Sequence, residues 1–252
     1  MHEPLRHLPP QNGDAIGHLL ARAWNLQGSP GQVFEIIERS DGFVGVCDAA
    51  EYFAPYAQWP EREQELLEAC RGRVLDVGCG AGRHLVHLQE RGHTVLGLDS
   101  SLGAVEICEK RGTPAQLGTA QDIPCADKTF DTILALGANL GLLGGREEAQ
   151  ATLQEWARVA APGAQVLATG RDPYASQGQI HSDYHQANRA AGRMAGQLRI
   201  RIRSGALASP YFDYLYASLA ELTQLLAPSP WALKHTIEDT HGGYGVILTL
   251  KD

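Results

Sequence analysis

Between residues 73 and 170, short apolar runs of strand length alternate with amphipathic runs of helix length. This alternation constrains the fold more than any other feature of the chain. The expected strands are 74–77, 94–98, 130–136 and 165–169, and the expected helices are the run through Leu85 and Leu88, 101–111 and 147–160. Strands that alternate with helices form parallel βαβ units, so the pattern predicts an α/β, doubly wound fold with helices on both faces of a mostly parallel sheet.

The end of the chain predicts that this sheet finishes in an antiparallel hairpin. Residues 232–237 and 244–250 are strand-like runs, joined by a turn at 240–243 that contains two glycines. Before them, Ser218 and Glu221 have the spacing of a capping box, which predicts a helix to about residue 226.

Two segments, residues 1–71 and residues 171–217, lie outside this alternation of strands and helices. The first is expected to contain a loose end over 1–13, a helix over 14–25, either a hairpin or a helix and a strand over 34–47, and a helix over 60–70. In the second, a possible helix begins at Asp183, residues 198–203 alternate as a half-exposed strand does, and 210–217 are aromatic. We therefore expect an N-terminal extension or lid of residues 1–71 and a domain of residues 72–252 that carries 171–217 as an insertion.

Composition limits the partners and the compartment. The 252 residues include 21 basic and 29 acidic side chains, and the net charge of −8 at pH 7 makes a nucleic-acid partner unlikely. The five cysteines are scattered and never in CxxC spacing, which indicates reduced thiols in a cytoplasmic protein and no metal site. No apolar run approaches the ~18 residues of a membrane span, and the first residues lack the apolar region of a secretory signal.

The chemistry begins at the sequence VLDVGCGAGRH, residues 74–84, where glycines at 78, 80 and 82 stand between a strand and a helix. Glycine permits tight turns and close approach of a ligand to the backbone, and the helix start offers unpaired N–H groups. The dinucleotide pattern GxGxxG needs a glycine where this chain has Arg83, which disfavours a nicotinamide cofactor. The spacing is instead GxGxG, preceded by Asp76.

This segment resembles motif I of the class I S-adenosylmethionine-dependent methyltransferases, more closely a methyltransferase type 11-like domain. Three further segments match the family in order: Leu96-Gly97-Leu98-Asp99, the stretch 118–136, and Ala157 to Gly163 before the next strand. With the terminal hairpin, the resemblance covers more than half of the chain. It implies a Rossmann-like, seven-stranded sheet, the cofactor S-adenosylmethionine and the product S-adenosylhomocysteine.

The resemblance also implies which residues bind the cofactor. Asp99 is expected to hold the ribose hydroxyls, and the segment after Gly118 is expected to flank the adenine. Family members often have Asp where this chain has Thr119, so backbone groups of Ala120 and Gln121, or the side chain of Asp122, would serve there. The implied set is Asp76, Gly78, Gly80, Gly82, Asp99, Ser100, Thr119, Ala120, Gln121 and Leu136.

The acceptor is expected to contact loops beyond the carboxyl ends of the strands and the segments outside the core. The candidate residues are Tyr52, Asn139, Arg171, Tyr174 and Tyr211. Asn139 precedes Leu140-Gly141, so the Asn-Pro-Pro-Tyr motif of amino-group and base methyltransferases is absent. Methyl transfer from a sulfonium needs mainly alignment, so the catalytic residues stay unknown and no triad or metal ligand set is expected.

Several residues have two interpretations. His181 and His185 would share a helix face as a metal or base pair does, but a solvated face is favoured because no third ligand is in view. His84 is expected either near the cofactor or in a local cap, and Cys79 as a small loop residue. The aromatic residues at 211–216 are expected either to form a wall around the acceptor or to belong to the core. Arg199, Arg201 and Arg203 are expected either to bind an anionic acceptor or to form a solvated face of the strand.

The leading hypothesis is methyl transfer to a small-molecule acceptor by a monomer or homodimer. The alternatives are an RNA or protein methyltransferase of the same fold, a nicotinamide-dependent oxidoreductase, and a cofactor-binding protein without catalysis.

Overall fold

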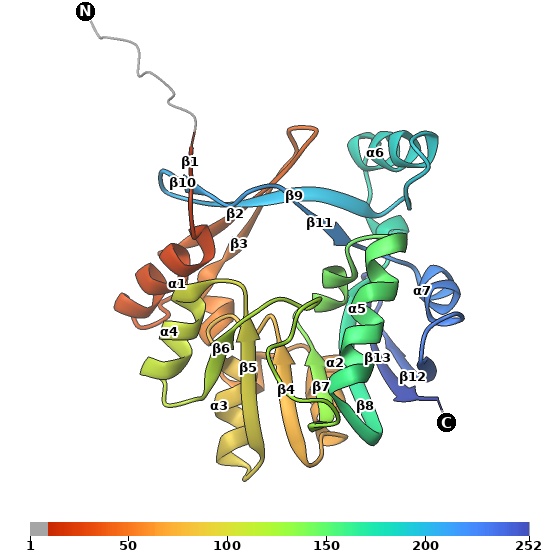
Figure 1. Cartoon of the computed structure of the whole chain (residues 1–252). Helices are drawn as coiled ribbons and strands as arrows, with labels where there is room; N and C mark the ends of the chain where they lie inside the picture. Colours follow the sequence, from red (N-terminus) through yellow and green to blue (C-terminus); the bar gives the residue numbers. More distant parts are fainter. Residues whose placement is uncertain (1–9, 252) are drawn as a thin grey trace, which may run out of the picture.

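The computed structural model describes residues 10–251 and contains two β-sheets (Figure 1). The larger sheet has seven strands in the order β12-β13-β8-β7-β4-β5-β6. Its strands are β4 (Arg73–Val77), β5 (Thr94–Asp99), β6 (Ala115–Leu117), β7 (Phe130–Ala135), β8 (Ala160–Arg171), β12 (Trp231–Glu238) and β13 (Gly243–Leu250). The strands from β6 to β8 run parallel, and β13 is antiparallel to both β8 and β12. The predicted fold class and terminal hairpin are therefore confirmed.

Helices cover both faces of the larger sheet because its strands are apolar on both sides. One face packs against α2 (Glu61–Glu68) and α3 (Arg83–Glu90), with Cys108 of α4 (Leu102–Lys110) in the same cluster. The other face packs against α5 (Arg146–Val159) and α7 (Leu219–Leu226). Trp156 and Trp231 are fully buried on this second face, where they fill the space between the sheet and the helices.

The second sheet joins segments from the two ends of the chain. It consists of β1 (Gln11–Asn12), β2 (Phe34–Arg39), β3 (Val44–Asp48), β9 (Gln197–Ser204), β10 (Leu207–Ala208) and β11 (Phe212–Leu215). Strand β2 pairs antiparallel with β3 on one side and with β9 on the other. The N-terminal extension and the insertion thus form one sheet, which lies across the carboxyl ends of β4, β5 and β7 (Figure 1). We call it the roof sheet.

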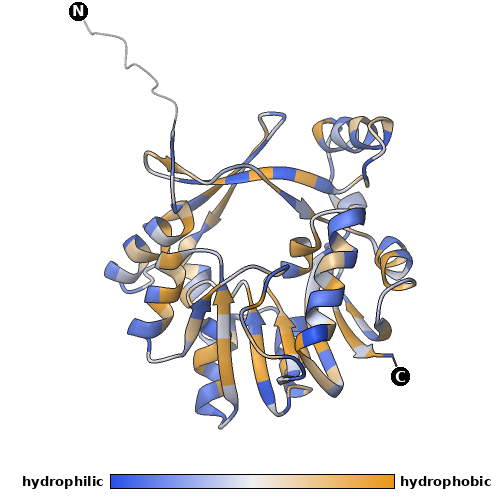
Figure 2. Ribbon diagram, in the orientation of Figure 1, coloured by the Kyte–Doolittle hydropathy of each residue, from blue (hydrophilic) through white to orange (hydrophobic). Residues whose placement is uncertain are grey.

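The alternation along β9 separates the two faces of the roof sheet (Figure 2). Ile200 and Ile202 are buried toward the larger sheet. The arginines between them pair with acidic side chains: Arg201 and Arg203 lie 2.9 and 3.3 Å from Glu38, and Arg199 lies 3.5 Å from Asp213. Glu38 thus serves two arginines, and Asp213 also pairs with Arg193 at 2.9 Å, so the row is only partly neutralised. The arginine side chains stay partly exposed, which agrees with the solvated-face interpretation.

Helix α1 (Ala15–Asn25) connects the roof sheet to the larger domain by packing on α4. Helix α6 (Gln179–Ala190) lies at the end of the roof sheet, and short 3-10 turns η1 (Ala49–Phe53), η2 (Tyr56–Gln58), η3 (Asn139–Leu143) and η4 (Pro173–Ala175) complete the fold. None of the helices in residues 10–251 is long and apolar enough to cross a membrane.

The structure corrects five details of the expected elements. Residues 34–48 form a hairpin, so the alternative of a helix followed by a strand is wrong. Strand β8 begins at Ala160 and passes through Pro162-Gly163, and α6 begins at Gln179, before Asp183. The short strand β6 has too few residues for a recognisable pattern. The expected loose end at 1–13 lies mostly outside the described residues, but Gln11–Asn12 pair with β10.

Candidate active site

A cavity of about 1150 Å³ lies between the carboxyl ends of the larger sheet and the roof sheet. Its floor consists of the glycine loop after β4, the end of β5 and the loops after β6 and β7, and its cover comes from β2, η1, β9 and β11. Neighbouring strands β4 and β7 carry the chain to opposite halves of the sheet. Ligands of open α/β sheets bind outside the strand ends at such a switch point.

The glycine loop presents backbone to this cavity. Gly78 and Gly80 have φ values of 71° and 54°, in the left-handed region where a side chain is strained. A Cβ atom at Gly80 would lie 3.0 Å from Cδ1 of Tyr52, and one at Gly78 would lie 2.6 Å from Nδ2 of Asn139. The two glycines therefore let the side chains of Tyr52 and Asn139 pack directly on the loop, which a side chain at either position would prevent.

Asp99 ends β5 beside the glycine loop and lines the cavity. Its two carboxylate oxygens accept hydrogen bonds from the backbone N–H groups of Gly80 and Ser101, each at 2.9 Å. Burial raises the pKa of Asp99, and these two hydrogen bonds oppose the shift. Each carboxylate oxygen can accept a second hydrogen bond, so the pair can still receive two vicinal hydroxyl groups.

A buried polar network supports the loop from behind. The ring of His84 lies between two acids, with Nδ1 3.5 Å from Asp76 and Nε2 3.4 Å from Glu63. Burial lowers the pKa of His84, but hydrogen bonds to the two acids outweigh it and leave the pKa raised. Glu63 also accepts from Arg83 at 2.6 Å and from the N–H of Gly137 at 3.2 Å. The network thus ties α2, the start of α3 and the end of β7 together.

The remaining residues of the implied cofactor set divide into two groups. Ser100, Thr119, Ala120, Gln121 and Leu136 line the cavity with Gly78, Gly80 and Asp99. Asp76 and Gly82 lie behind the loop and do not line it, because the carboxylate of Asp76 points to His84. Asp122 also lies outside the lining, and its N–H donates to the hydroxyl of Thr119 at 3.1 Å.

Of the expected acceptor residues, Tyr52, Asn139 and Tyr211 line the cavity, whereas Arg171 and Tyr174 do not. The side chain of Tyr174 is half exposed, and its hydroxyl donates to Glu221 at 2.7 Å. The turn after β8 directs it toward α7 and away from the roof sheet. The amide nitrogen of Asn139 donates to the carbonyl groups of Val77 and Gly78 at 3.1 and 2.9 Å, so this residue also anchors the end of β4.

Glu35 and Asp14 were not among the expected site residues, whereas Tyr214 was one of the aromatic residues expected either in an acceptor wall or in the core. Glu35 on β2 is only 7% exposed and accepts a hydrogen bond from the hydroxyl of Tyr52 at 3.2 Å. Tyr214 on β11 donates to the carbonyl of Ala138 at 2.8 Å. Asp14 caps α1 and accepts from the hydroxyl of Ser101 at 2.9 Å. Asp14 had a local signal as an acid before a helix, but Glu35 and Tyr214 reach the site only through the pairing of the roof sheet.

The remaining candidates from the sequence are the histidine pair on α6, a metal site and Cys79. His185 is buried on α6, so a fully solvated face for the histidine pair is wrong, and His181 lies 3.1 Å from Arg39. Within residues 10–251, no cluster of three or more His, Cys, Asp or Glu is placed to hold a metal ion. Cys79 is buried 3.8 Å from Cys108; the hydrogen bond with Cys108, burial and nearby acids raise its pKa well above the usual value, so it is a poor nucleophile.

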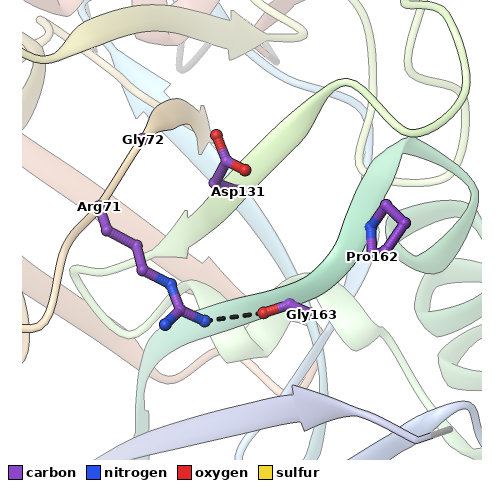
Figure 3. A pocket seen from close by; sticks show the side chains of 5 residues that line it. All are labelled: Arg71, Gly72, Asp131, Pro162 and Gly163. Carbon is purple, nitrogen blue, oxygen red and sulfur yellow. Dashed lines mark hydrogen bonds between the residues drawn. The ribbon is translucent and has the colours of Figure 1, made fainter.

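A second depression, of about 410 Å³, lies at the opposite edge of the larger sheet (Figure 3). There the guanidinium of Arg71 donates to the carbonyl of Gly163 at 2.7 Å, and the carboxylate of Asp131 accepts from the N–H of Arg73 at 2.8 Å. These polar groups satisfy one another. The depression adjoins the amino ends of the strands, where open α/β sheets do not usually bind ligands.

Known proteins share this fold and this motif region. A family model described as a methyltransferase domain matches residues 74–163. The crystal structure of a SAM-dependent methyltransferase from Bacteroides fragilis in complex with S-adenosyl-L-homocysteine covers 97% of each chain at 25% identity, with a TM-score of 0.80. The match therefore includes the roof sheet as well as the larger sheet.

Curated relatives match over a shorter stretch. A probable tRNA methyltransferase 9B from Bos taurus is 32% identical over 48% of this chain and 28% of its own length. A demethylmenaquinone methyltransferase from Corynebacterium kroppenstedtii is 33% identical over 43% of this chain and 46% of its own length. The matches thus span about a quarter to a half of these relatives.

The glycine loop, the acid that ends β5, the strand order and the whole-chain structural match agree with one another. The chain therefore belongs to the class I S-adenosylmethionine-dependent methyltransferases.

Proposed function

We propose that this protein transfers a methyl group from S-adenosylmethionine to a small, aromatic acceptor enclosed beneath the roof sheet. The family uses this cofactor, and the cavity fits it. Gly78 and Gly80 line the cavity, Asp99 has lone pairs for the ribose hydroxyls, and the exposed apolar side chains of Leu102 and Leu117 can cover a flat base.

The observation that carries the proposal is the aromatic and apolar lining that the roof sheet contributes. Ile37 on β2 and Ile200 and Ile202 on β9 line the cavity. The same wall includes the rings of Tyr211, Phe212, Tyr214 and Tyr216. Small-molecule sites are mostly apolar and aromatic with a few polar groups, and they enclose most of the ligand. This lining favours a planar, partly apolar acceptor.

The charges around the cavity argue against an RNA acceptor. Its acidic lining residues are Asp14, Glu35, Asp48, Glu51, Asp99, Glu148 and Asp213. Its arginines are Arg83, which pairs with Glu63, and Arg199, which lies near Asp213. An acidic rim attracts a sulfonium cation and repels a phosphate backbone. The proposed acceptor therefore differs from the tRNA named for the mammalian relatives, whose similarity covers only half of this chain.

The protein's contribution to such a reaction is alignment and exclusion of water. The bound cofactor supplies an activated methyl group on a sulfonium. Asp99 and the glycine loop fix it from below, and the roof sheet holds the acceptor on the opposite side. Holding two reactants in line removes much of the entropic cost of their encounter, and an enclosed site keeps water away from the methyl group.

Two experiments test the proposal. Calorimetric titration should show binding of both S-adenosylmethionine and S-adenosylhomocysteine; no binding of either at millimolar concentration would refute it. Radiolabelled methyl transfer should then be measured with small phenols, quinols and aryl amines, and separately with total tRNA. Label in a small aromatic compound supports the proposal. Label in tRNA alone would replace the proposed acceptor class with RNA.

A further inference from the structure

Glu35 is the most deeply buried acid that lines the cavity, and the proposed cofactor set does not use it. Its side chain lies on the inner face of β2, opposite Cys47 on β3. Its single side-chain partner is the hydroxyl of Tyr52, at 3.2 Å. Among residues 10–251, no arginine or lysine forms an ion pair with it. A buried carboxyl without a basic partner is costly to ionise.

Tyr52 connects Glu35 to the cofactor loop. Its hydroxyl reaches Glu35, and its ring packs directly over Gly80, 3.0 Å from where a Cβ atom would stand. The carboxyl of Glu35 therefore lies one tyrosine side chain away from the glycine loop. It faces the space between this loop and the aromatic wall of the roof sheet, where methyl donor and acceptor must meet.

The titratable and charged groups around Glu35 are few. Cys47 lies on β3, Glu51 and Tyr52 on η1, and Tyr214 and Tyr216 on and just after β11. Arg171 at the end of β8 acts on Cys47 and Tyr216, and His18 on α1 faces Ser204. Burial, opposed by the Tyr52 hydrogen bond, raises the pKa of Glu35 from 4.5 to about 7.

Building on the proposed function, we propose that Glu35 is the general base of the methyl-transfer site and that the acceptor is a hydroxyl, phenolic in class. Without cofactor, Glu35 keeps its proton in the buried site. A cation in the cavity favours the charged form of a nearby carboxyl, so a bound sulfonium converts Glu35 to the carboxylate. Cofactor binding thereby prepares the base for the acceptor.

The reaction then balances with Glu35 as the proton acceptor. The acceptor oxygen forms a bond to the methyl carbon, and the bond from that carbon to sulfur breaks with both electrons left on sulfur. The proton of the acceptor hydroxyl passes to the carboxylate of Glu35. The products are the methyl ether, the uncharged thioether and the protonated Glu35. The role of Tyr52 is to position Glu35 through its hydrogen bond.

The first test counts protons and needs no acceptor. Calorimetric titrations near pH 7, in buffers of different ionisation enthalpy, should show about half a proton more released on binding S-adenosylmethionine than S-adenosylhomocysteine. The two ligands differ only by the methyl group and the charge on sulfur. Glu35→Gln should abolish this excess. Glu109→Gln, which removes an exposed acid of α4 that does not line the cavity, should retain it.

The outcomes separate this inference from the proposed function. If neither ligand binds the wild-type protein, the proposed function fails. If both bind but the proton excess is the same with and without Glu35, only the role of Glu35 is overturned. If Glu35→Gln does not fold, infrared difference spectra of the wild-type protein test whether cofactor binding removes the proton of Glu35. The band of a protonated carboxyl should disappear with S-adenosylmethionine and persist with S-adenosylhomocysteine.

A phenol that accepts label then allows a second test. The wild-type kcat/KM for S-adenosylmethionine should rise with pH through a limb near 7, set by Glu35 in the free protein. The limb in kcat should lie at lower pH, because the bound sulfonium favours the carboxylate. Glu35→Gln should lower kcat about 100-fold or more and remove both limbs. Tyr52→Phe should keep both limbs but shift them, as expected of a positioning residue. An unchanged kcat and pH profile in Glu35→Gln would overturn the role.

Discussion

Asp99 combines two tasks that usually belong to different residues. Its carboxylate orders the glycine loop through the N–H of Gly80 and begins the next helix through the N–H of Ser101. The two backbone donors fix the orientation of the carboxylate and leave a lone pair on each oxygen for a hydroxyl group. The same side chain therefore orders the loop and is the one proposed to hold the ribose hydroxyls.

Removing this carboxylate should weaken cofactor binding strongly. We expect Asp99→Ala to lose about 2–3 kcal/mol, or roughly 30-fold to 150-fold in affinity for S-adenosylhomocysteine, because hydrogen bonds to charged groups are among the strongest. Titration calorimetry measures the change. Glu109→Ala, which removes an exposed acid from α4, is the matched control and should bind as the wild type does. Equal affinities for all three proteins would refute the ribose role of Asp99.

Glu35 should also make stability depend on pH without any ligand. Because burial raises its pKa from 4.5 to about 7, the folded state holds the proton more tightly than the unfolded chain. Its contribution to stability is fully present below pH 4.5 and is lost as the pH rises through about 7. A shift of this size corresponds to at most about 3 kcal/mol.

Glu35→Gln should therefore gain stability relative to the wild type between pH 5 and pH 8, because Gln keeps the Tyr52 hydrogen bond and does not ionise. Urea unfolding at the two pH values measures the change in the free energy of unfolding. Glu109→Gln, at an exposed position on α4, serves as the comparison and should follow the wild type. Parallel pH dependence of the Glu35 variant and the wild type would contradict the raised pKa.

At the scale of elements, the side chains that cap the N-termini of α1 and α7 have different roles. Asp14 caps α1 through the N–H of Gly17 at 2.7 Å, and its other oxygen accepts from Ser101 and from the N–H of Gly103 at the start of α4. One carboxylate thus joins two helices beside Asp99. Ser218, in contrast, forms a capping box with Glu221 at the start of α7 and does not line the cavity.

Alanine at these two caps should separate stability from binding. Asp14→Ala and Ser218→Ala should each cost about 1 kcal/mol of stability, the usual value of a lost N-cap. Only Asp14→Ala should also weaken S-adenosylhomocysteine binding, by several-fold, because Ser101 and Asp99 lose their support. Thermal unfolding and calorimetry measure the two effects. Equal binding by both variants would show that the link between α1 and α4 does not reach the site.

At the scale of the whole molecule, the roof sheet makes the two outer segments interdependent. Ile37 on β2 and Ile202 on β9 are paired residues of neighbouring antiparallel strands. Each segment alone would leave an unpaired strand edge above the cavity. The two segments therefore form one unit although the entire larger sheet up to β8 separates them in the sequence.

This interdependence predicts long-range effects on hydrogen exchange. Ile202→Ala should cost about 2–4 kcal/mol and should speed amide exchange in β2 and β3 as well as in β9, because the pairing between them loosens. The larger sheet, including β7, should be unaffected. Leu225→Ala, at a buried position on α7, should instead speed exchange near β12 and leave β2 unchanged. Protection that changes only within β9 would contradict a single roof sheet.

The larger sheet and its cofactor edge could be predicted from the sequence because their signals are local. The periodicity between residues 73 and 170 predicts its helices and all of its strands there except short β6, and the glycine loop, its Arg83 and Asp99 lie within 22 contiguous residues. The capping box at Ser218 and the terminal hairpin are equally local. Each feature depends on residues a few positions apart, so no knowledge of distant contacts is needed.

The sequence alone therefore determined the fold class and the family, and it predicted the residues proposed to bind the cofactor. Only the tertiary structure decided that residues 34–48 and 197–215 form one roof, that Glu35 and Tyr214 face the cavity, and that Arg171 and Tyr174 do not line it. The physical reason is that pairing between distant strands depends on the register of backbone hydrogen bonds, and the partner of a strand leaves no mark in its own side-chain pattern.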